Sequence, residues 1–410
     1  MVDQRDPVLF VLPPGGAGKG FREHLGAAFL RAVLLRAGIS SRQYLPNRMP
    51  SLTDFEAYLR ERSPAIVGFT VYETNLHLSR ALAEVVHKAL PETVVLVGGP
   101  TATFTPEEAL DLVGADGCLR GAGEAVMVAI AERILGAARP RRDLSGILND
   151  LPNLVLRTPE APISTRSTIL SSFPYGGFET LDDIPSPFQA GLVSSAEIGY
   201  VTARGCNQQC TYCSFAAVSA HQIRFHGVER VLDDLAALEQ LGSGGMPQKV
   251  EILDDAFTLV PDRARRICEG ILDRGLHLDL SCSTRGDRVD RALLQTMRRA
   301  GFTSVAFGLE SAVPRILRTI GKVSSPETSG DPGFDTEKEF LTTMRASVAE
   351  AREAGLRVYV SVMGGLPTET AHDFRTTLAF VDSLGVNGYA HNLLTRFPGT
   401  PLYAQRERFG

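Results

Sequence analysis

Two series of short apolar runs alternate with longer amphipathic stretches along this chain of 410 residues. Short apolar runs bounded by turn residues are typical of strands, and the stretches between them have helical periodicity. Strands that alternate with helices predict parallel sheets covered by helices, which is the α/β class. The strands predicted in the first series are residues 8–12, 42–45, 65–71, 94–97 and 117–120. We therefore expect a doubly wound domain over residues 1–138.

The second series begins after residues 139–196, a Pro- and Ser-rich segment in which prolines disfavour regular structure. We expect this segment to be a linker with one or two short strands. Residues 197–410 then form the second domain, and its predicted strands are 198–203, 249–253, 276–283, 304–309, 357–363 and 388–393. Six strand–helix repeats predict an open, partial (β/α)6 barrel similar to part of a TIM barrel. Ligands are then expected in the loops after its strands, and the turn-forming residues 324–335 are either a surface loop or a lid there.

The loop after the first barrel strand places three thiols, Cys206, Cys210 and Cys213, within eight residues. Iron–sulfur clusters are bound by cysteine thiolates, and a four-iron cluster bound only by protein needs four of them. Three cysteines at this spacing therefore predict a cluster with one iron left open to a small ligand. Tyr212, beside the last cysteine, lowers the polarity of the surroundings.

Zinc and disulfide bonds are the alternative explanations for these cysteines. A structural zinc site needs four ligands, and His221 or His226 is available as the fourth. Disulfides fit poorly because the N-terminus is charged rather than signal-like. The remaining cysteines, Cys118, Cys268 and Cys282, lie apart in apolar contexts and are expected to be buried thiols.

The C-x3-C-x2-C pattern after a strand resembles the signature of the radical S-adenosylmethionine (SAM) enzymes, and the resemblance extends over residues 198–402. It implies a [4Fe-4S] cluster whose open iron binds SAM, and further SAM contacts at the ends of later barrel strands. Acidic residues would accept hydrogen bonds from the amino group, an arginine would bind the carboxylate and a glutamate the ribose hydroxyls. The residues assigned in this way are Cys206, Cys210, Cys213, Tyr212, Asp254, Asp255, Ser283, Arg285, Glu310 and Gly364. After the fifth strand, Thr368 or Glu369 is expected to cap the next helix.

Glycines and small polar residues gather at the predicted strand ends of the first domain. Together they resemble the Rossmann-like, N-terminal cobalamin-binding domain that is fused to some radical SAM barrels. The resemblance implies that cobalamin contacts Pro14, Gly15, Thr70, Tyr72, Glu73, Thr74, Asn75, Gly98, Gly99, Pro100, Thr101, Gly121, Gly123 and Glu124. Small residues at these places let a flat ring approach the backbone.

A dinucleotide site is the competing interpretation of this domain, but residues 15–20, GGAGKG, do not match G-x-G-x-x-G. Other cobalamin domains carry D-x-H-x-x-G, whose histidine ligates cobalt, and His24 lacks that context because Arg22 and Ala27 occupy the flanking positions. We therefore expect cobalamin bound without a histidine ligand. By resemblance, residues 72–75 face the lower side of cobalt.

The two resemblances together imply a cobalamin-dependent radical SAM methyltransferase. Such an enzyme transfers a methyl group from SAM, through methylcobalamin, to an unactivated carbon or to phosphorus of a specialised metabolite or peptide. A non-methylating radical rearrangement, cyclisation or oxidation is the enzymatic alternative, and sulfur insertion into RNA is another. A cobalamin-binding sensor or carrier is the alternative without catalysis, and it would not need the three cysteines.

Composition limits the partners. The formal net charge of −5 with interspersed acids and bases argues against nucleic acid, and no apolar stretch is long enough to span a membrane. Reduced thiols and an oxygen-sensitive cluster favour the cytoplasm. We expect a monomer that takes a small-molecule or peptide substrate and an external electron donor such as flavodoxin or ferredoxin.

Overall fold

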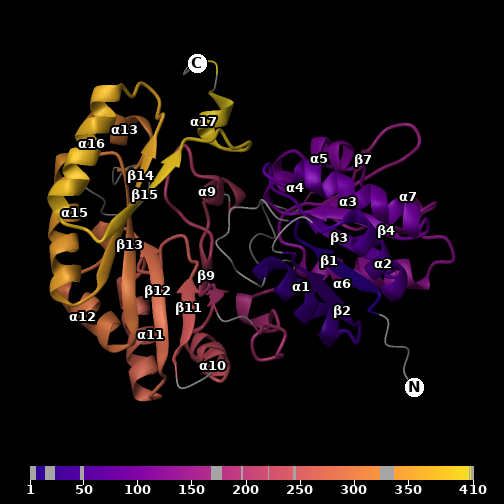
Figure 1. Cartoon of the computed structure of the whole chain (residues 1–410), viewed down its shortest axis with the longest axis horizontal. Coiled ribbons are helices and arrows are strands. Elements are labelled where there is room, and N and C mark those ends of the chain that lie inside the picture. Colours follow the sequence, from indigo (N-terminus) through magenta and orange to yellow (C-terminus); the bar gives the residue numbers. More distant parts are fainter. Residues whose placement is uncertain are drawn as a thin grey trace. The chain divides into compact units, whose positions relative to one another are not determined.

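The computed structural model describes residues 6–13, 24–46, 50–167, 178–194, 197–219, 221–242, 246–323, 337–405 and 407. The chain divides into two compact units, Met1–Ser195 and Ala196–Gly410, which Figure 1 colours from indigo to magenta and from magenta to yellow. None of the helices in these described ranges is long and apolar enough to cross a membrane.

The first unit is built on a seven-stranded sheet with the order β2-β1-β3-β4-β5-β6-β7. Neighbouring strands from β2 to β5 pair in parallel, and β6 and β7 pair antiparallel. The strands are β1 (Val8–Val11), β2 (Ser41–Tyr44), β3 (Ile66–Thr70), β4 (Val94–Gly98), β5 (Gly117–Leu119), β6 (Leu154–Leu156) and β7 (Ile163–Ser164). The helices are α1 (Leu25–Arg36), α2 (Leu52–Arg62), α3 (Leu76–Ala89), α4 (Pro100–Phe104), α5 (Pro106–Val113), α6 (Glu124–Gly136), α7 (Leu144–Leu148) and the 3-10 turn η1 (Leu181–Asp183).

Helices cover both faces of this sheet (Figure 1). Alternate residues of each strand point to opposite faces, so β1 supplies Leu9 and Val11 to one core and Val8 and Phe10 to the other. The first core contains α2, α3 and α5, and the second contains α1, α6 and α7. The predicted doubly wound domain is confirmed. Strand order reverses between β1 and β3, where such sheets bind ligands.

The segment predicted as a linker with one or two short strands, residues 139–196, does contain two short strands. Its first half forms α7 and the two antiparallel strands β6 and β7, and both belong to the first unit. Leu154 and Leu156 are buried in the core beside α6 and α7. Antiparallel strands can follow one another through short turns, so the sheet extends without further crossover helices.

The second unit contains a six-stranded parallel sheet with the order β15-β14-β13-β12-β11-β8. Its strands are β8 (Glu197–Tyr200), β11 (Gln248–Ile252), β12 (Leu278–Thr284), β13 (Phe302–Glu310), β14 (Arg357–Gly364) and β15 (Gly388–Leu393), and β9 (Ala203–Arg204) pairs with β10 (Arg224–Phe225) in a separate ladder. The helices are α9 (Ser214–Val218), α10 (Val228–Glu239), α11 (Pro261–Asp273), α12 (Arg291–Arg299), α13 (Pro314–Thr319), α15 (Glu337–Glu353), α16 (Ala371–Leu384), α17 (Pro401–Ala404) and the turn η2 (Gly286–Arg288).

The two faces of this sheet differ in burial. Val358, Val360 and Val362 of β14 are buried against the helices, whereas Tyr359 between them is 37% exposed. In Figure 1, α10, α11, α12, α15 and α16 lie along one side of the sheet. The other face is the inside of an incomplete barrel, because the sheet ends at the edge strands β8 and β15. The predicted six-stranded partial barrel is confirmed.

Candidate functional site

The three cysteines lie in the loop between β9 and α9, and the short β9–β10 ladder closes this loop at its base. Cys206 and Cys210 are buried, and Cys213 is half-buried at the N-cap of α9. The loop follows β8, so it sits at the carboxyl end of the first barrel strand, where the sequence places it.

The loop bends at Gly205, whose φ of 88° is in the left-handed region. A Cβ at this position would lie 2.2 Å from the Gln222 carbonyl oxygen and 2.7 Å from the Ser219 Cβ. Glycine is therefore required twice over, for conformation and for space. Beyond the bend, the Cys206 amide donates to the Ser219 hydroxyl at 3.3 Å.

Two backbone hydrogen bonds fix the loop to later parts of the barrel. The Thr211 amide donates to the Ile320 carbonyl at 2.9 Å, and the Leu402 amide donates to the Thr211 carbonyl at 2.9 Å. Residues at the end of α13 and the start of α17 thereby hold the cysteine loop over the strand ends. The shape of the loop therefore depends on contacts with residues about 100 and 190 positions after Thr211 in the sequence.

The thiols are held in surroundings that suit a bound cation. Burial raises the pKa of Cys206 to about 12 and that of Cys213 to about 11, and backbone amides of Gln208 and Ala216 directed at these sulfurs offset part of the rise. The electrostatic effect of Cys210 reaches both thiols, so the three thiols lie near one another. Since only thiolates bind iron, a positively charged cluster would compensate the burial, and the residues present fit such a group.

The zinc alternative gains no support from the two histidines. His221 Nδ1 lies 2.9 Å from the Gln208 carbonyl oxygen, so this nitrogen carries the proton and Nε2 keeps its lone pair, but in the described part of the chain no group of ligands lies around it. His226 is buried, and its carbonyl oxygen accepts from Arg263. Among the residues that the structure describes, no three His, Cys, Asp or Glu side chains come close enough to bind one metal ion. This holds for the three loop cysteines too, and it is compatible with a cluster because each thiolate of a cluster binds a different iron. All six cysteines are free, and Cys118, Cys268 and Cys282 are buried, as predicted.

Tyr212 connects the cysteine loop to the ends of three barrel strands. Tyr212 and Met363 of β14 both pack against a buried cluster formed by Ile316, Ile320 and Leu366. Burial raises the pKa of Tyr212, and the nearby Glu310 carboxylate raises it further, so the phenol stays protonated. Arg285 at the end of β12 also lies within electrostatic reach of this phenol.

Glu310 and Arg285 are buried at neighbouring strand ends, and each has a partner of opposite charge. Arg285 donates to both oxygens of Asp287 at 2.9 Å. Burial lowers the pKa of Arg285, but Asp287 and the thiols of Cys210 and Cys206 raise it more. Glu310 lies 3.2 Å from the ammonium of Lys322. The sequence predicts the first residue of each pair, but it carries no signal for Asp287 or Lys322 as partners.

Asp254 differs from Arg285 and Glu310 because its carboxylate is hydrogen-bonded mainly to backbone amides. Its carboxylate accepts the amides of Thr202 and Ala203 at 2.6 and 3.0 Å and the Thr202 hydroxyl. Burial raises its pKa, and these hydrogen bonds counter part of the rise. Arg263 of α11 donates to the Thr202 hydroxyl and carbonyl at 2.9 Å each. Asp254 thus holds the chain between β8 and β9, and its expected contact with SAM stays a prediction.

Asp255, the next residue, is a carboxyl group within electrostatic reach of the cysteines. Burial raises its pKa to about 7, and the adjacent Asp254 adds to the rise. Its electrostatic effect reaches both Cys206 and Cys213. A half-buried carboxyl group at this pKa suits a cationic ligand.

After β14 the chain turns sharply before α16. Glu369 accepts the amides of Gly365 and Leu366 at 2.7 and 3.2 Å, which closes the turn. The expectation that Thr368 or Glu369 caps the next helix is wrong: the N-cap is Thr370, which forms a capping box with Asp373. Gly364 is buried, and a Cβ there would lie 2.9 Å from a ring nitrogen of His391. Ser283, at the end of β12, is exposed.

In the first unit, the loop after β3 lies at the reversal of strand order. Asn75 is fully buried, accepts the Tyr72 amide at 2.8 Å and donates to the Thr70 carbonyl at 3.1 Å. Both ends of its side-chain amide therefore hold the loop, while Glu73 and Thr74 at its tip are exposed. This geometry gives Asn75 a structural role and leaves the tip open to a ligand.

His24 reaches this loop from the start of α1. Its Nδ1 accepts the Ala27 amide at 3.1 Å as the N-cap of α1, and its Nε2 lies 3.3 Å from the Tyr72 hydroxyl. Because Nδ1 accepts, Nε2 carries the proton and donates to Tyr72. Burial lowers the pKa of His24 to about 4, so the ring is neutral near pH 7.

The other expected cofactor contacts lie at the same edge of the first sheet. Gly98, Gly99, Thr101 and Gly121 are half-buried, Pro100 is exposed, and Gly123 and Glu124 are buried at the start of α6. A Cβ at Gly123 would lie 2.6 Å from the Leu119 side chain, so this glycine allows α6 to approach β5. Pro14 and Gly15, like the expected lid at 324–335, lie outside the described residues.

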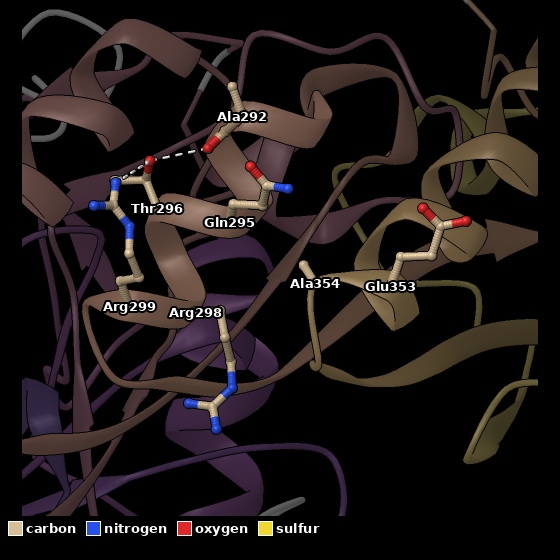
Figure 2. Close-up of a pocket in the computed structure, with 7 residues that line it drawn as sticks. All are labelled: Ala292, Gln295, Thr296, Arg298, Arg299, Glu353 and Ala354. Atoms are coloured by element: carbon tan, nitrogen blue, oxygen red, sulfur yellow. Dashed lines mark hydrogen bonds between the residues drawn. The ribbon is translucent and has the colours of Figure 1, made fainter.

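An open pocket of about 510 Å³ lies on the outer side of the barrel (Figure 2). It is lined by Arg298 and Arg299 at the end of α12 and by Glu353 and Ala354 at the end of α15. Both helices end just before β13 and β14 begin, so this pocket adjoins the amino ends of the strands. It is separate from the site at their carboxyl ends.

Two protein-family models match the chain, one in each unit. Residues 18–131 match the B12 binding domain, and residues 200–381 match the Radical SAM superfamily. The match boundaries agree with the two units and include all three cysteines of the loop.

Several known proteins are similar to the chain. An uncharacterised methyltransferase of Pyrococcus horikoshii is 28% identical over 361 residues, which cover 86% of this chain and 72% of that protein. The cytidylyl-2-hydroxyethylphosphonate methyltransferase of Streptomyces wedmorensis is 27% identical over 66% of this chain and 54% of its own length. The structure of the radical SAM methyltransferase TsrM of Kitasatospora setae aligns with a TM-score of 0.76 at 19% identity, over 97% of this chain and 74% of TsrM. This last likeness shows that the two share a fold.

Proposed function

Because this chain belongs to the radical SAM superfamily and carries a B12-binding domain before its radical SAM domain, we propose that it is a cobalamin-dependent methyltransferase. It moves a methyl group from SAM to an unactivated carbon, or to phosphorus, of a specialised metabolite or peptide. The observation that carries the proposal is the presence of three cysteines in one loop of the barrel, two buried and one half-buried, together with a second ligand edge in the doubly wound unit. The similar methyltransferases of Pyrococcus horikoshii and Streptomyces wedmorensis support it.

Cys206, Cys210 and Cys213 hold the [4Fe-4S] cluster in this proposal, and the open iron binds SAM. When bound, the cluster supplies an electron to SAM and the corrinoid carries a methyl group to the substrate. The protein's part is to keep the thiolates dry and oriented. Amides directed at the sulfurs, together with the anchoring of Thr211 to Ile320, do this.

The strand-end residues bind the parts of SAM that do not react. Arg285 uses three of its five N–H groups on Asp287 and the Lys322 carbonyl, which leaves two for the SAM carboxylate. Asp255 is the better placed of the two aspartates to accept the amino group, since Asp254 is occupied by Thr202 and Ala203. Glu310 accepts hydrogen bonds from the ribose hydroxyls of SAM, and Tyr212, whose phenol lies within electrostatic reach of Glu310, packs beside the ribose.

The substrate lies against the uncovered face of the barrel sheet. Polar and exposed groups of this face include Ser283 on β12, Tyr359 and Ser361 on β14, and Asn392 on β15, which donates to Ser361 at 3.1 Å. Side chains of this kind suit a polar small molecule or a peptide. We place the enzyme in the cytoplasm as a monomer supplied by flavodoxin or ferredoxin, with no nucleic-acid or membrane partner.

Cobalamin binds at the carboxyl ends of β1, β3, β4 and β5, where Thr70, Tyr72, Gly98 and Gly99 lie. The loop tip, Glu73 and Thr74, faces outward from this edge. No histidine ligates cobalt in our proposal, because the proton on Nε2 of His24 excludes a free lone pair there.

Labelled SAM tests the proposal without knowledge of the substrate. The anaerobically reconstituted protein is incubated with hydroxocobalamin, a low-potential reductant and SAM labelled on its methyl group. We expect the label in the protein-bound corrinoid, and in a new small molecule or peptide once cell extract is added. Corrinoid that is retained but never labelled would indicate that cobalamin serves another reaction. Failure to retain corrinoid would refute the proposal altogether.

A further inference from the structure

Lys322 is a buried lysine at the carboxyl end of the barrel sheet, just after α13. Its side chain is 7% exposed and lies 3.2 Å from the Glu310 carboxylate, whose side chain is 10% exposed. Lysine and glutamate are seldom buried to this degree. The desolvation of two charges offsets most of what one ion pair returns, so stability alone is a weak explanation for the pair.

The backbone around Glu310 is shaped to make the pair. Glu310 has a φ of 65°, a left-handed conformation that is uncommon for a residue with a side chain. The register between β13 and β14 shifts between Gly308 and Glu310. A Cβ at Gly308 would lie 2.9 Å from both Glu310 Oε1 and Lys322 Nζ. Uncommon backbone of this kind gathers at functional sites, where surrounding structure holds it in place.

Lys322 also contacts Arg285, the residue proposed to bind the SAM carboxylate, through its backbone carbonyl. The Arg285 guanidinium donates to the Lys322 carbonyl at 3.2 Å, in addition to its two bonds with Asp287. One residue therefore touches both Glu310 and Arg285, which come from the neighbouring strands β13 and β12.

The two residues before Lys322 hold the cysteine loop. The Ile320 carbonyl accepts the Thr211 amide at 2.9 Å. A Cβ at Gly321 would lie 2.8 Å from the Gln209 carbonyl, so this close approach needs a glycine. Residues 320–322 thus join the cysteine loop, Glu310 and Arg285 into one assembly.

Lys322 is the partner found for the Glu310 carboxylate in the part of the chain that the structure describes, and it contacts one oxygen, Oε1. The second oxygen is left for a ligand. We propose that Lys322 is a positioning residue for SAM, which rests on the proposed function: its ammonium holds the Glu310 carboxylate directed at the SAM ribose hydroxyls.

The dissociation constant of SAM tests this role. It is measured by anaerobic equilibrium dialysis of labelled SAM against cluster-reconstituted protein, without cobalamin or substrate. Lys322→Met should weaken SAM binding about tenfold, the size of one charge-assisted hydrogen bond, and Lys322→Arg should recover part of the loss. Iron content should stay at the wild-type level. Lys249→Met, which removes an exposed lysine paired with Glu197, should leave binding unchanged.

Glu310→Gln and the double variant decide whether Lys322 acts through Glu310. Glu310→Gln alone should weaken SAM binding about tenfold. The double variant, in which both charges are neutralised, should bind SAM as Glu310→Gln does. A double variant about tenfold weaker than Glu310→Gln would overturn the proposal. This comparison serves even if Lys322→Met alone fails to fold, because removal of both members of a buried pair is tolerated better than removal of one.

The outcomes separate this inference from the proposed function. If the wild-type protein and Lys322→Met bind SAM equally well, the role of Lys322 is overturned and the proposed function stands. Wild-type protein with a full cluster and no SAM binding contradicts both.

Discussion

Replacement of Gly205 by alanine adds one methyl group at the bend that begins the cysteine loop. An alanine at a φ of 88° costs about 1–2 kcal/mol in backbone energy. The added Cβ would also lie 2.2 Å from the Gln222 carbonyl oxygen, and overpacking of this kind costs about 1–3 kcal/mol. The sum, roughly 2–5 kcal/mol, is comparable to the lower range of whole-domain stability. We therefore expect the loop to rearrange and cluster binding to fail.

Urea unfolding and iron content measure the effect. Gly275→Ala is the matched control, because Gly275 has a φ of 64° and no atom within 4 Å of the added Cβ. The control should show the backbone cost alone and bind iron as wild type does. The difference between the two variants, about 1–3 kcal/mol, is the contact cost. Equal destabilisation of both, with full iron in Gly205→Ala, would refute the claim that close packing shapes this loop.

Three further predictions concern single residues. Asp254→Asn should destabilise the second unit by about 3 kcal/mol, because it removes a buried charge that accepts hydrogen bonds from Thr202 and Ala203. Urea unfolding measures this loss, and the control Asp273→Asn, at an exposed position, should change stability by under about 0.5 kcal/mol. His24 has a pKa of about 4 when folded and about 6.5 when unfolded, so the unfolded chain gains the proton first and stability falls as the pH drops from 6.5 to 4. His24→Asn, which can still cap α1, should lack this part of the pH dependence in thermal unfolding, and equal slopes would contradict it. His24→Asn should leave the electron paramagnetic resonance spectrum of bound cob(II)alamin unchanged, and a nitrogen superhyperfine splitting that is lost in this variant would show that His24 ligates cobalt.

The fold followed closely from local patterns. Strands such as β14 and β15 are apolar or alternating runs bounded by turn residues, and their positions were predicted to within about one residue. The family assignment is confirmed by the two matched domains. In the segment predicted as a linker with one or two short strands, the pairing of β6 and β7 with the first sheet was not foreseen, because these strands are only three and two residues long, too short for a periodic signal.

The site was predicted in part. Arg285 and Glu310 were assigned as SAM contacts from the family resemblance, and the structure places both at carboxyl ends of parallel strands, which meet at one edge of the sheet; their contact with SAM stays a prediction. Their partners are not visible, since the contact of Lys322 with Glu310 depends on the left-handed backbone at 310. Arg263 likewise reads as the polar face of an amphipathic helix, although it is buried and holds Thr202. Such contacts arise from packing between distant segments and leave no local pattern.

The central claim is that Cys206, Cys210 and Cys213 together bind the cluster that cleaves SAM. The direct measurement is 5′-deoxyadenosine formation from SAM by anaerobically reconstituted, reduced protein, in the wild type and in the three single Cys→Ala variants. We expect product from the wild type and none from any variant, while each variant retains cobalamin by its visible spectrum. Cys268→Ala, which alters a buried thiol away from the loop, should remain active. Continued cleavage by any one of the three loop variants would contradict the claim.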